Sequence, residues 1–294
     1  MVYYTSASGN YKKKYGEKVY KLALSCATTC PNRDGTLGVG GCIFCSGSSG
    51  DFAESASLPI DEQIENAKRR ILKKTDAKKF IAYFQSYTST YARVDHLEKM
   101  FLSAAKRDDI VELSIATRPD CLGDDVLDLL ARVAKIKPVT VELGLQTVHE
   151  KTAEIINRCS HLSDFTLSVT KLKSIGVEVV MHVILGLPDE THDMMLETVQ
   201  YVVDLNADGI KLQLLHILKG TKLEHMYNEG KVTPLEMSEY FSILEKCLKL
   251  IPKEMVVHRL TGDGARRKLI APLWSLDKKR VINSLSCVCR PYDL

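Results

Sequence analysis

The stretch Leu24–Gly50 reads LSCATTCPNRDGTLGVGGCIFCSGSSG, and the arrangement of the rest of the chain can be worked out from it. Four of the nine cysteines fall inside it, at Cys26, Cys30, Cys42 and Cys45. A proline, an asparagine, an aspartate and four glycines separate the second and third of these cysteines, which predicts a loop. Clustered thiolates favour zinc or an iron–sulfur cluster over magnesium or calcium. The sequence therefore predicts a metal centre in this loop.

Three kinds of site are compatible with these cysteines. Four thiolates could complete the tetrahedron of a structural zinc ion, as in a zinc ribbon. Three thiolates could hold an iron–sulfur cluster and leave one iron open to another ligand. A thioredoxin-like redox pair is the third possibility, although such a pair should open a helix in a much smaller domain. The spacing alone leaves zinc and iron–sulfur open.

Outside this stretch, predicted strands alternate with predicted amphipathic helices. The strands cover residues 18–24, 80–85, 111–117, 139–145, 177–185 and 210–215, and the helices cover 62–74, 93–106, 124–135, 150–157, 164–175 and 190–205. This alternation is typical of βα units with parallel strands. It predicts an α/β fold, an open partial (β/α)6 barrel. A mainly helical C-terminal extension follows, with helices at 223–229, 234–250 and 277–285 and a strand-like stretch at 255–260.

Polar residues gather toward the C-terminal ends of the predicted strands, where βα barrels carry their reactive groups. Because alternate residues of a strand share a face, they should line one polar interior facing the cysteine loop. The residues concerned are Gln85, Arg118, Glu142, Gln146, His182, Lys211 and Gln213. His182, Lys211 and Gln213 are the candidate catalytic residues, although a single histidine in an apolar strand is more often a packed interior residue. Burial of Glu142 would be costly without a partner, which Arg118, Lys211 or a ligand amine could supply.

The cysteine spacing, Cys30 followed by eleven residues and then Cys42-Ile43-Phe44-Cys45, resembles that of radical S-adenosylmethionine (SAM) enzymes with an expanded first spacing. That version is similar to the elongator catalytic subunit and its bacterial relatives. The segment Leu185–Thr191, LGLPDET, resembles the SAM-binding strand end of the superfamily. The strings TCPNRDGT, YFQSYTSTYA, TRPDCL, VELGLQT and RLTGDGARRKLIAPLWSL together resemble one bacterial subfamily over nearly the whole chain.

The resemblance implies a [4Fe–4S] cluster held by Cys30, Cys42 and Cys45, with SAM bound beside it. Arg33 stands where the commoner short spacing after Cys26 would need its third cysteine, so Cys26 is expected to lie beside the cluster. A ligand role for Cys26 is the alternative.

The resemblance also implies a set of residues that contact SAM. They are Gln85, Ser86, Tyr87, Arg118, Glu142, Gln146, Ile184, Gly186, Leu187 and Pro188. Residues 85–87 replace the usual Gly-Gly-Glu turn of the superfamily, which leaves open the group that holds the methionine amine. Gly186 is expected to let the backbone approach the adenine, because glycine has no Cβ.

The reaction implied by the resemblance is reductive cleavage of SAM to a 5′-deoxyadenosyl radical. The substrate implied is the C5 side chain of the wobble uridine of transfer RNA, at the carboxymethylaminomethyl group or an equivalent step. The expected partners are the anticodon stem-loop of tRNA and an electron donor such as flavodoxin or ferredoxin. Two alternatives are a radical SAM enzyme that acts on a small metabolite and a non-catalytic zinc-ribbon protein that binds nucleic acid.

Composition limits the class of protein further. A hydrophobic share of 45% and a net charge of +3 are typical of a globular protein and exclude a generally basic nucleic-acid coat. Nine cysteines without an apolar leader or a membrane-length apolar run predict a cytoplasmic protein. We divide the chain into a basic arm (1–17), the barrel (18–220) with its cluster loop (25–50), and an extension (221–294) covering the barrel.

Four short runs of cations interrupt this nearly neutral sequence. They are Lys12-Lys13-Lys14, Lys68-Arg69-Arg70, Arg266-Arg267-Lys268 and Lys278-Lys279-Arg280. Solvated surface is the simpler interpretation, and a phosphate-binding rim around the mouth of the barrel is the functional one.

Overall fold

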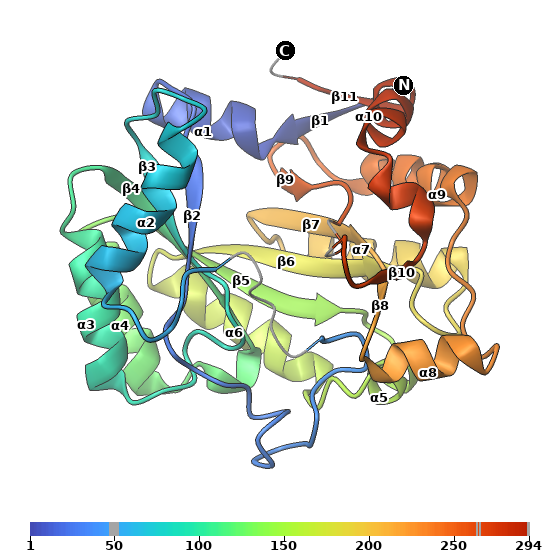
Figure 1. Ribbon diagram of the computed structural model, residues 1–294, viewed down its shortest axis with the longest axis horizontal. Helices are drawn as coiled ribbons and strands as arrows, with labels where there is room; N and C mark the ends of the chain where they lie inside the picture. Colours follow the sequence, from blue (N-terminus) through green and yellow to red (C-terminus); the bar gives the residue numbers. More distant parts are fainter. Residues whose placement is uncertain (47–52, 263, 265, 293–294) are drawn as a thin grey trace.

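A sheet of nine strands forms the centre of the computed structural model, which describes residues 1–46, 53–262, 264 and 266–292 (Figure 1). The order is β11-β1-β9-β7-β6-β5-β4-β3-β2, and every neighbouring pair is parallel. The strands are β1 (Val2–Ser6), β2 (Tyr20–Leu24), β3 (Phe80–Phe84), β4 (Ile110–Thr117), β5 (Val139–Gln146), β6 (Glu178–Leu185), β7 (Gly209–Leu214), β9 (Val256–Arg259) and β11 (Cys289–Pro291). Two more strands, β8 (Ile217–Leu218) and β10 (Leu269–Ala271), form a separate antiparallel pair.

Helices connect successive strands from β2 to β7 and confirm the predicted partial (β/α)6 barrel. They are α2 (Ile60–Leu72), α3 (Val94–Ala105), α4 (Asp124–Ala134), α5 (Glu150–Ile155), α6 (Leu162–Ser174) and α7 (His192–Asp204). The other helices are α1 (Ala7–Tyr15), α8 (Lys222–Asn228), α9 (Met237–Leu250) and α10 (Lys278–Val288), with 3₁₀ turns at Pro119–Cys121 and Leu273–Leu276. No helix in the described part of the chain combines the length and the apolar character that a membrane crossing needs.

The sequence explains why these elements form and pack. Strand β6 is a run of β-branched and other apolar residues that is buried on both faces, as parallel strands under helices are. Helix α4 starts with Asp124 and Asp125, which suit the positive end of the helix dipole, and buries an apolar stripe against the sheet. In the core the rings of Phe84 and Phe101 meet edge to face, with centroids 5.0 Å apart.

The first residues take part in the sheet. Strand β1 lies between β9 and β11, with Thr5 beside Val256 and Val2 beside Cys289. Helix α1 then reaches the N-terminal ends of the barrel strands, where Lys14 pairs with Glu112 and Glu178 at 3.3 and 3.0 Å. Residues 1–17, expected to form a basic arm, thus contribute one strand and one helix. The described part of residues 221–294 contributes three strands as well as helices, and two of these strands, β9 and β11, join the large sheet.

Gly186, directly after β6, has a φ of +90°. A Cβ there would lie 2.9 Å from Leu235 Cδ1, so the packing of Leu235 depends on the missing side chain. Gly176 offers a matched control, because its φ is +75° and a Cβ would meet nothing within 4 Å.

We expect Gly186→Ala to lower the free energy of unfolding by about 2–4 kcal/mol, since backbone strain and crowding add together. Gly176→Ala should cost only the strain, about 1–2 kcal/mol. Urea denaturation of both variants measures the difference. Equal losses would show that Leu235 moves aside freely.

Candidate functional site

A cavity of about 330 Å³ opens at the C-terminal ends of the barrel strands. Three cysteines of the loop after β2 line it: Cys30, Cys42 and Cys45. Residues on or directly after β3, β4, β5, β6, β7 and β9 complete the wall, among them Tyr83, Gln85, Tyr87, Thr117, Arg118, Glu142, Gly144, Gln146, His182, Gln213 and Arg259. The structure therefore brings together the thiols and most of the polar strand ends that the sequence predicts.

The cysteine loop is fastened to the barrel through Ile43. Its N–H donates to the carbonyl of Ile156 at 3.1 Å, and its own carbonyl accepts from the N–H of Leu223 at 3.0 Å. Figure 1 shows the loop reaching from β2 across to α5 and α8. The Ile43 side chain belongs to an apolar cluster that also contains Ile184 and Leu187. Because Ile43 lies between Cys42 and Cys45, these contacts fix both thiols in place.

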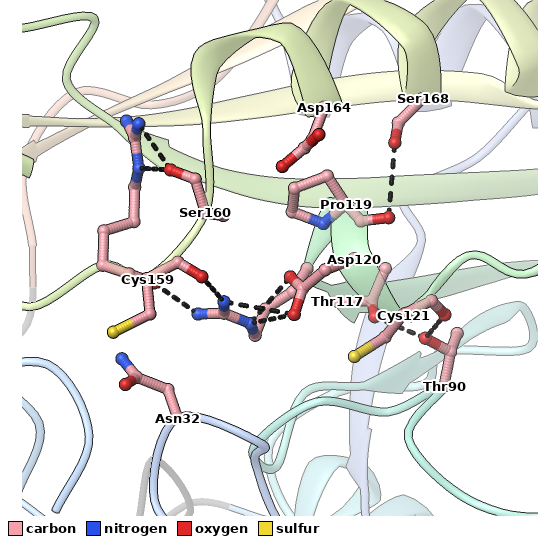
Figure 2. Close-up of polar contacts among 12 residues, drawn as sticks. Asn32, Thr90, Thr117, Pro119, Asp120, Cys121, Cys159, Ser160, Asp164 and Ser168 are labelled. Atoms are coloured by element: carbon pink, nitrogen blue, oxygen red, sulfur yellow. Dashed lines mark hydrogen bonds and ion pairs between the residues drawn. The ribbon is translucent and has the colours of Figure 1, made fainter. Parts of the chain in front are cut away.

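Cationic and amide groups surround the thiols. Arg118 donates to the carbonyl oxygens of Arg158 and Cys159 at 2.8 and 2.9 Å and pairs with Asp120 at 3.0 Å. Figure 2 shows these contacts around Asp120 and Cys159. Burial and the neighbouring Cys45 raise the pKa of the Cys42 thiol to about 12, while Arg118 opposes that rise. The thiolate of Cys42 therefore needs a bound cation or metal centre to form near neutral pH.

Two side chains of the loop point toward thiol sulfurs. Arg33 Nη1 lies 3.6 Å from Cys45 Sγ, and Asn32 Nδ2 lies 3.6 Å from Cys42 Sγ. Donors at sulfur stabilise its negative charge, which is one of the ways a protein adjusts an iron–sulfur cluster.

Cys26 lies apart from this group. It is fully buried in the main apolar core, and its carbonyl accepts a hydrogen bond from His96 at 2.8 Å. Burial holds the pKa of its thiol well above the ordinary value. In the described part of the chain, no three histidine, cysteine or acidic side chains are arranged to hold a single metal ion. Because Cys26 lies in the core while Cys30, Cys42 and Cys45 line the cavity, the four cysteines do not converge on one tetrahedral site.

Glu142 is the centre of a buried polar network on the cavity floor. Five side chains contact its carboxylate: Lys21 (3.1 Å) and Ser114 (2.8 Å) at Oε1, and Tyr83 (2.9 Å), His182 (2.9 Å) and Lys211 at Oε2. Burial opposes ionisation of Glu142, but Lys21 and Lys211 outweigh it and hold its pKa well below the ordinary value. Five partners fill the roughly four lone-pair sites of a carboxylate, so Glu142 has no capacity left for a ligand amine.

The two candidate catalytic groups beside Glu142 have pKa values far below their ordinary ones. Burial, together with the charge of Lys211, lowers the pKa of His182 to about 4, so its ring is neutral near pH 7. Burial lowers the pKa of Lys211 to about 7. The positive charges of Lys21 and Arg259 lower it as well, whereas the negative charge of Glu142 raises it. Lys211 can therefore gain or lose a proton near neutral pH.

The predicted SAM contacts divide between two places. Gln85, Tyr87, Arg118, Glu142 and Gln146 line the cysteine cavity. The segment Ile184–Pro188 does not: Ile184 and Leu187 are buried in the apolar cluster with Ile43, and Gly186–Pro188 line a smaller cavity beside Leu235. The missing Cβ of Gly186 makes room for Leu235. Ser86 is buried outside the cavity lining, where its carbonyl accepts from Thr28 at 3.5 Å. Lys211 also lies outside the lining, bound to Glu142.

Tyr87 and Gln146 combine a position in the cavity wall with strained backbone. Their φ values are +55° and +67°, which non-glycine residues rarely adopt. The Oε1 atom of Gln146 is buried and has no hydrogen-bond partner among the described residues. Strain and an unsatisfied buried acceptor are costly, and both are typical of residues that serve a ligand.

Several cavity residues escape the sequence analysis. Arg33, Arg158 and Arg259 line the cavity, and Arg158 is only 1% exposed. Arg158 lies in the turn after α5, where it donates to the carbonyls of Leu145 (3.1 Å) and Ser160 (2.9 Å). Arg259 is the last residue but one of the stretch 255–260 that the sequence predicts to be strand-like, so its place near a strand end was the available signal. Cys159, in the same turn as Arg158, is exposed.

Comparison with known proteins agrees with this geometry. Residues 27–202 match the Radical SAM superfamily, and residues 207–287 match the Radical_SAM C-terminal domain. The chain is 45% identical over 284 residues to the uncharacterized protein YtqA of Bacillus subtilis, covering 96% of this chain and 88% of that protein. It is 27% identical over 156 residues to a tRNA uridine(34) acetyltransferase of Methanocaldococcus jannaschii, covering 52% of this chain and 28% of that one. Among solved structures, the Elp3 of Methanocaldococcus infernus superimposes with a TM-score of 0.69 at 16% identity, over 93% of this chain and 64% of that one.

The Glu142 network makes a prediction about stability. Glu142→Gln should lower the free energy of unfolding by about 3–5 kcal/mol, because the buried ammonium of Lys211 loses its counter-charge. The pKa of Lys211 is about 7 in the folded chain against an ordinary 10.5, so the unfolded chain binds the extra proton and stability rises with pH between these values. Removing the Glu142 charge lowers the pKa of Lys211 further, so the loss should be larger near pH 6 than near pH 9.

Urea denaturation at the two pH values measures this loss. Glu178→Gln is the matched control, since Glu178 is 49% exposed and pairs with Lys14 at the other end of the barrel. Its effect should stay below about 1 kcal/mol. Equal losses for the two variants would mean that Glu142 is not the counter-charge of Lys211.

Proposed function

Because this chain belongs to the radical SAM superfamily and is therefore an enzyme that uses a [4Fe–4S] cluster and SAM, we propose that its substrate is the wobble uridine of transfer RNA. The reaction would take place at the C5 side chain, on the carboxymethylaminomethyl group or an equivalent substituent. The observation that carries this proposal is a group of exposed cations on the segments around β8 and β10, of which Lys222 approaches the cysteine loop. The partial match to a tRNA uridine(34) acetyltransferase supports it.

We assign the cluster to Cys30, Cys42 and Cys45. These three thiols line one cavity, whereas Cys26 lies in the core. Three ligands leave one iron of the cluster free for SAM. When bound there and reduced by a donor such as flavodoxin or ferredoxin, the cluster and SAM would supply the radical chemistry that acts on the substrate.

The residues of this chain have separate tasks in that cavity. Arg118 and Arg33 offset the negative charge of the three thiolates. Gln146 Oε1, which lacks a partner among the described residues, would accept a hydrogen bond from a hydroxyl of the cofactor ribose. Ile184 and Leu187 act on the site through Ile43, by holding the cysteine loop. Lys211 is the group that can hold or release a proton at Nζ near neutral pH.

These exposed cations come from the segments around β8 and β10. The N–H of Lys219 donates to the carbonyl of Lys268 at 2.7 Å, which joins the two segments. Arg266 and Arg267 are exposed. Lys222 approaches the cysteine loop, since a Cβ at Gly40 would lie 3.6 Å from its Nζ. Backbone phosphates bind to such surfaces largely without regard to sequence.

The two cation runs in the N-terminal part of the chain, 12–14 and 68–70, do not lie near the cysteine loop. Lys14 pairs with Glu112 and Glu178 at the N-terminal ends of the strands, and Lys68 pairs with Asp109, directly before β4. These runs therefore lie at the end of the barrel away from the cysteines, and the rim interpretation applies only to the C-terminal runs.

The cluster assignment is tested by single substitutions. Replacing Cys30, Cys42 or Cys45 with Ala should remove most of the iron and sulfide bound after anaerobic reconstitution, because a three-point site loses its geometry with any one ligand. Cys26→Ala is the matched control and should retain its iron. Loss of iron from Cys26→Ala as complete as that from Cys42→Ala would show that the assignment is wrong.

The tRNA surface is tested by reversing charge at each end of the barrel. Arg266→Glu combined with Arg267→Glu should weaken tRNA binding roughly tenfold at low salt and reduce the slope of log affinity against log salt by about 1.5, since two phosphate contacts are lost. Lys12→Glu combined with Lys13→Glu is the matched control, because both lysines are exposed at the opposite end. Equal tRNA affinity of the two folded variants would show that Arg266 and Arg267 do not contribute to tRNA binding, and it would favour a small metabolite as the substrate.

A further inference from the structure

Arg259 ends β9, and its side chain lines the cysteine cavity. Its Nη1 donates to Gln213 Oε1 at 2.8 Å, which fixes the direction of the guanidinium. No carboxylate of the described residues forms an ion pair with it. A guanidinium has five N–H donors, so Arg259 keeps most of them for another acceptor.

The other arginines of the cavity have acceptors or anionic partners already. Arg118 pairs with Asp120 at 3.0 Å, and Arg158 pairs with Glu150 at 3.4 Å. Arg33 lies beside the sulfur of Cys45. Among the described arginines that line the cavity, Arg259 is thus the one that neither pairs with an acidic side chain nor lies beside a thiol.

The surroundings of Arg259 contain more positive than negative charge. Lys211 stands beside Arg259 in the register of β7 and β9, and Lys21 contacts the same carboxylate as Lys211. Glu142 is the one acid in this group of described residues, and its five partners occupy it fully. Three cations around one carboxylate leave an excess of two charges, or of one charge when Lys211 is neutral. An interior with this imbalance favours a bound anion.

We propose that Arg259, held by Gln213, binds a carboxylate of the substrate. This inference rests on the proposed function and deepens it: the group recognised is the carboxylate of a carboxymethylaminomethyl side chain on the uridine. The guanidinium matches a carboxylate with two parallel hydrogen bonds, and the amide Nε2 of Gln213 can add a third. Arg259 and Gln213 belong to the β7–β9 side of the cavity, next to the β8 segment where the exposed cations lie, so a nucleotide bound there would present its base to them.

SAM carries a carboxylate as well, so the test separates the two sources. The reconstituted, SAM-loaded protein is titrated with carboxymethylaminomethyluridine and with aminomethyluridine, which lacks the carboxylate. The wild-type protein should bind the first nucleoside about 10- to 100-fold more tightly, the effect of a hydrogen-bonded charge. In Arg259→Gln this ratio should fall close to one, with unchanged affinity for aminomethyluridine. Arg259→Lys should retain part of the preference.

A control variant and two further measurements accompany this titration. Arg132→Gln removes an exposed arginine that pairs with Glu98, and it should keep the wild-type ratio. Iron content and thermal unfolding report whether each variant is folded and loaded. The inference is overturned if the wild type does not distinguish the nucleosides, or if Arg259→Gln distinguishes them as the wild type does. A loss of SAM affinity in Arg259→Gln by the same factor would assign the arginine to the cofactor instead.

The same titration with tRNA separates this inference from the proposed function. A carboxylate preference that depends on Arg259, combined with equal binding of modified and unmodified tRNA, would keep the anion site and remove tRNA as the substrate. Tight tRNA binding through Arg266 and Arg267 without any preference for the carboxylate would keep the tRNA proposal and remove the anion site.

Discussion

The polar interior of the barrel depends on one buried ion pair, that between Glu142 and Lys211. Neither side chain could be buried alone, because an unpaired charge would lose its hydration without compensation. Their contact brings together β5 and β7, which both neighbour β6, and β6 adds His182 to the same carboxylate. Lys21 and Tyr83 extend the network to β2 and β3. Strands on both sides of the open barrel are thus joined by one carboxylate below the cysteine loop.

This arrangement separates the support of the site from its binding surface. Glu142 is saturated and acts as a counter-charge, whereas the groups with free capacity lie above it, at Gln146 and Arg259. The cysteine loop is held separately, by the apolar cluster that contains Ile43, Ile184 and Leu187. Polar groups therefore set the charge of the cavity, and apolar packing sets the position of the thiols.

Much of the barrel could be predicted from sequence because its elements are long and strongly periodic. Strand β6 and helix α4 begin and end within a residue or two of the predicted limits, and the cysteine spacing identified the loop that lines the cavity. Strands β1 and β11 were missed, since they are short and their pairing joins residues almost the whole chain apart. Arg158 and Arg259 were missed for a related reason: their roles depend on which strands and turns become neighbours. Gly186 shows a different limit of sequence analysis. The motif that contains it can be identified from the sequence, but the residue that occupies the space of its missing Cβ, Leu235, is determined by tertiary packing.

The place of β1 between β9 and β11 has a consequence for the order of events during synthesis. The ribosome produces β1 before the six barrel strands, yet both of its neighbours in the sheet, β9 and β11, are produced after them. The six barrel strands can pair one after another as they are made, since each lies next to its predecessor in the sheet. The first five-residue strand must wait, with its backbone groups satisfied by water, until residues 256–259 and 289–291 are available. Strand β1 is thus made before the barrel strands and placed after them, and the nascent barrel exposes the edge of β7 until β9 pairs with it.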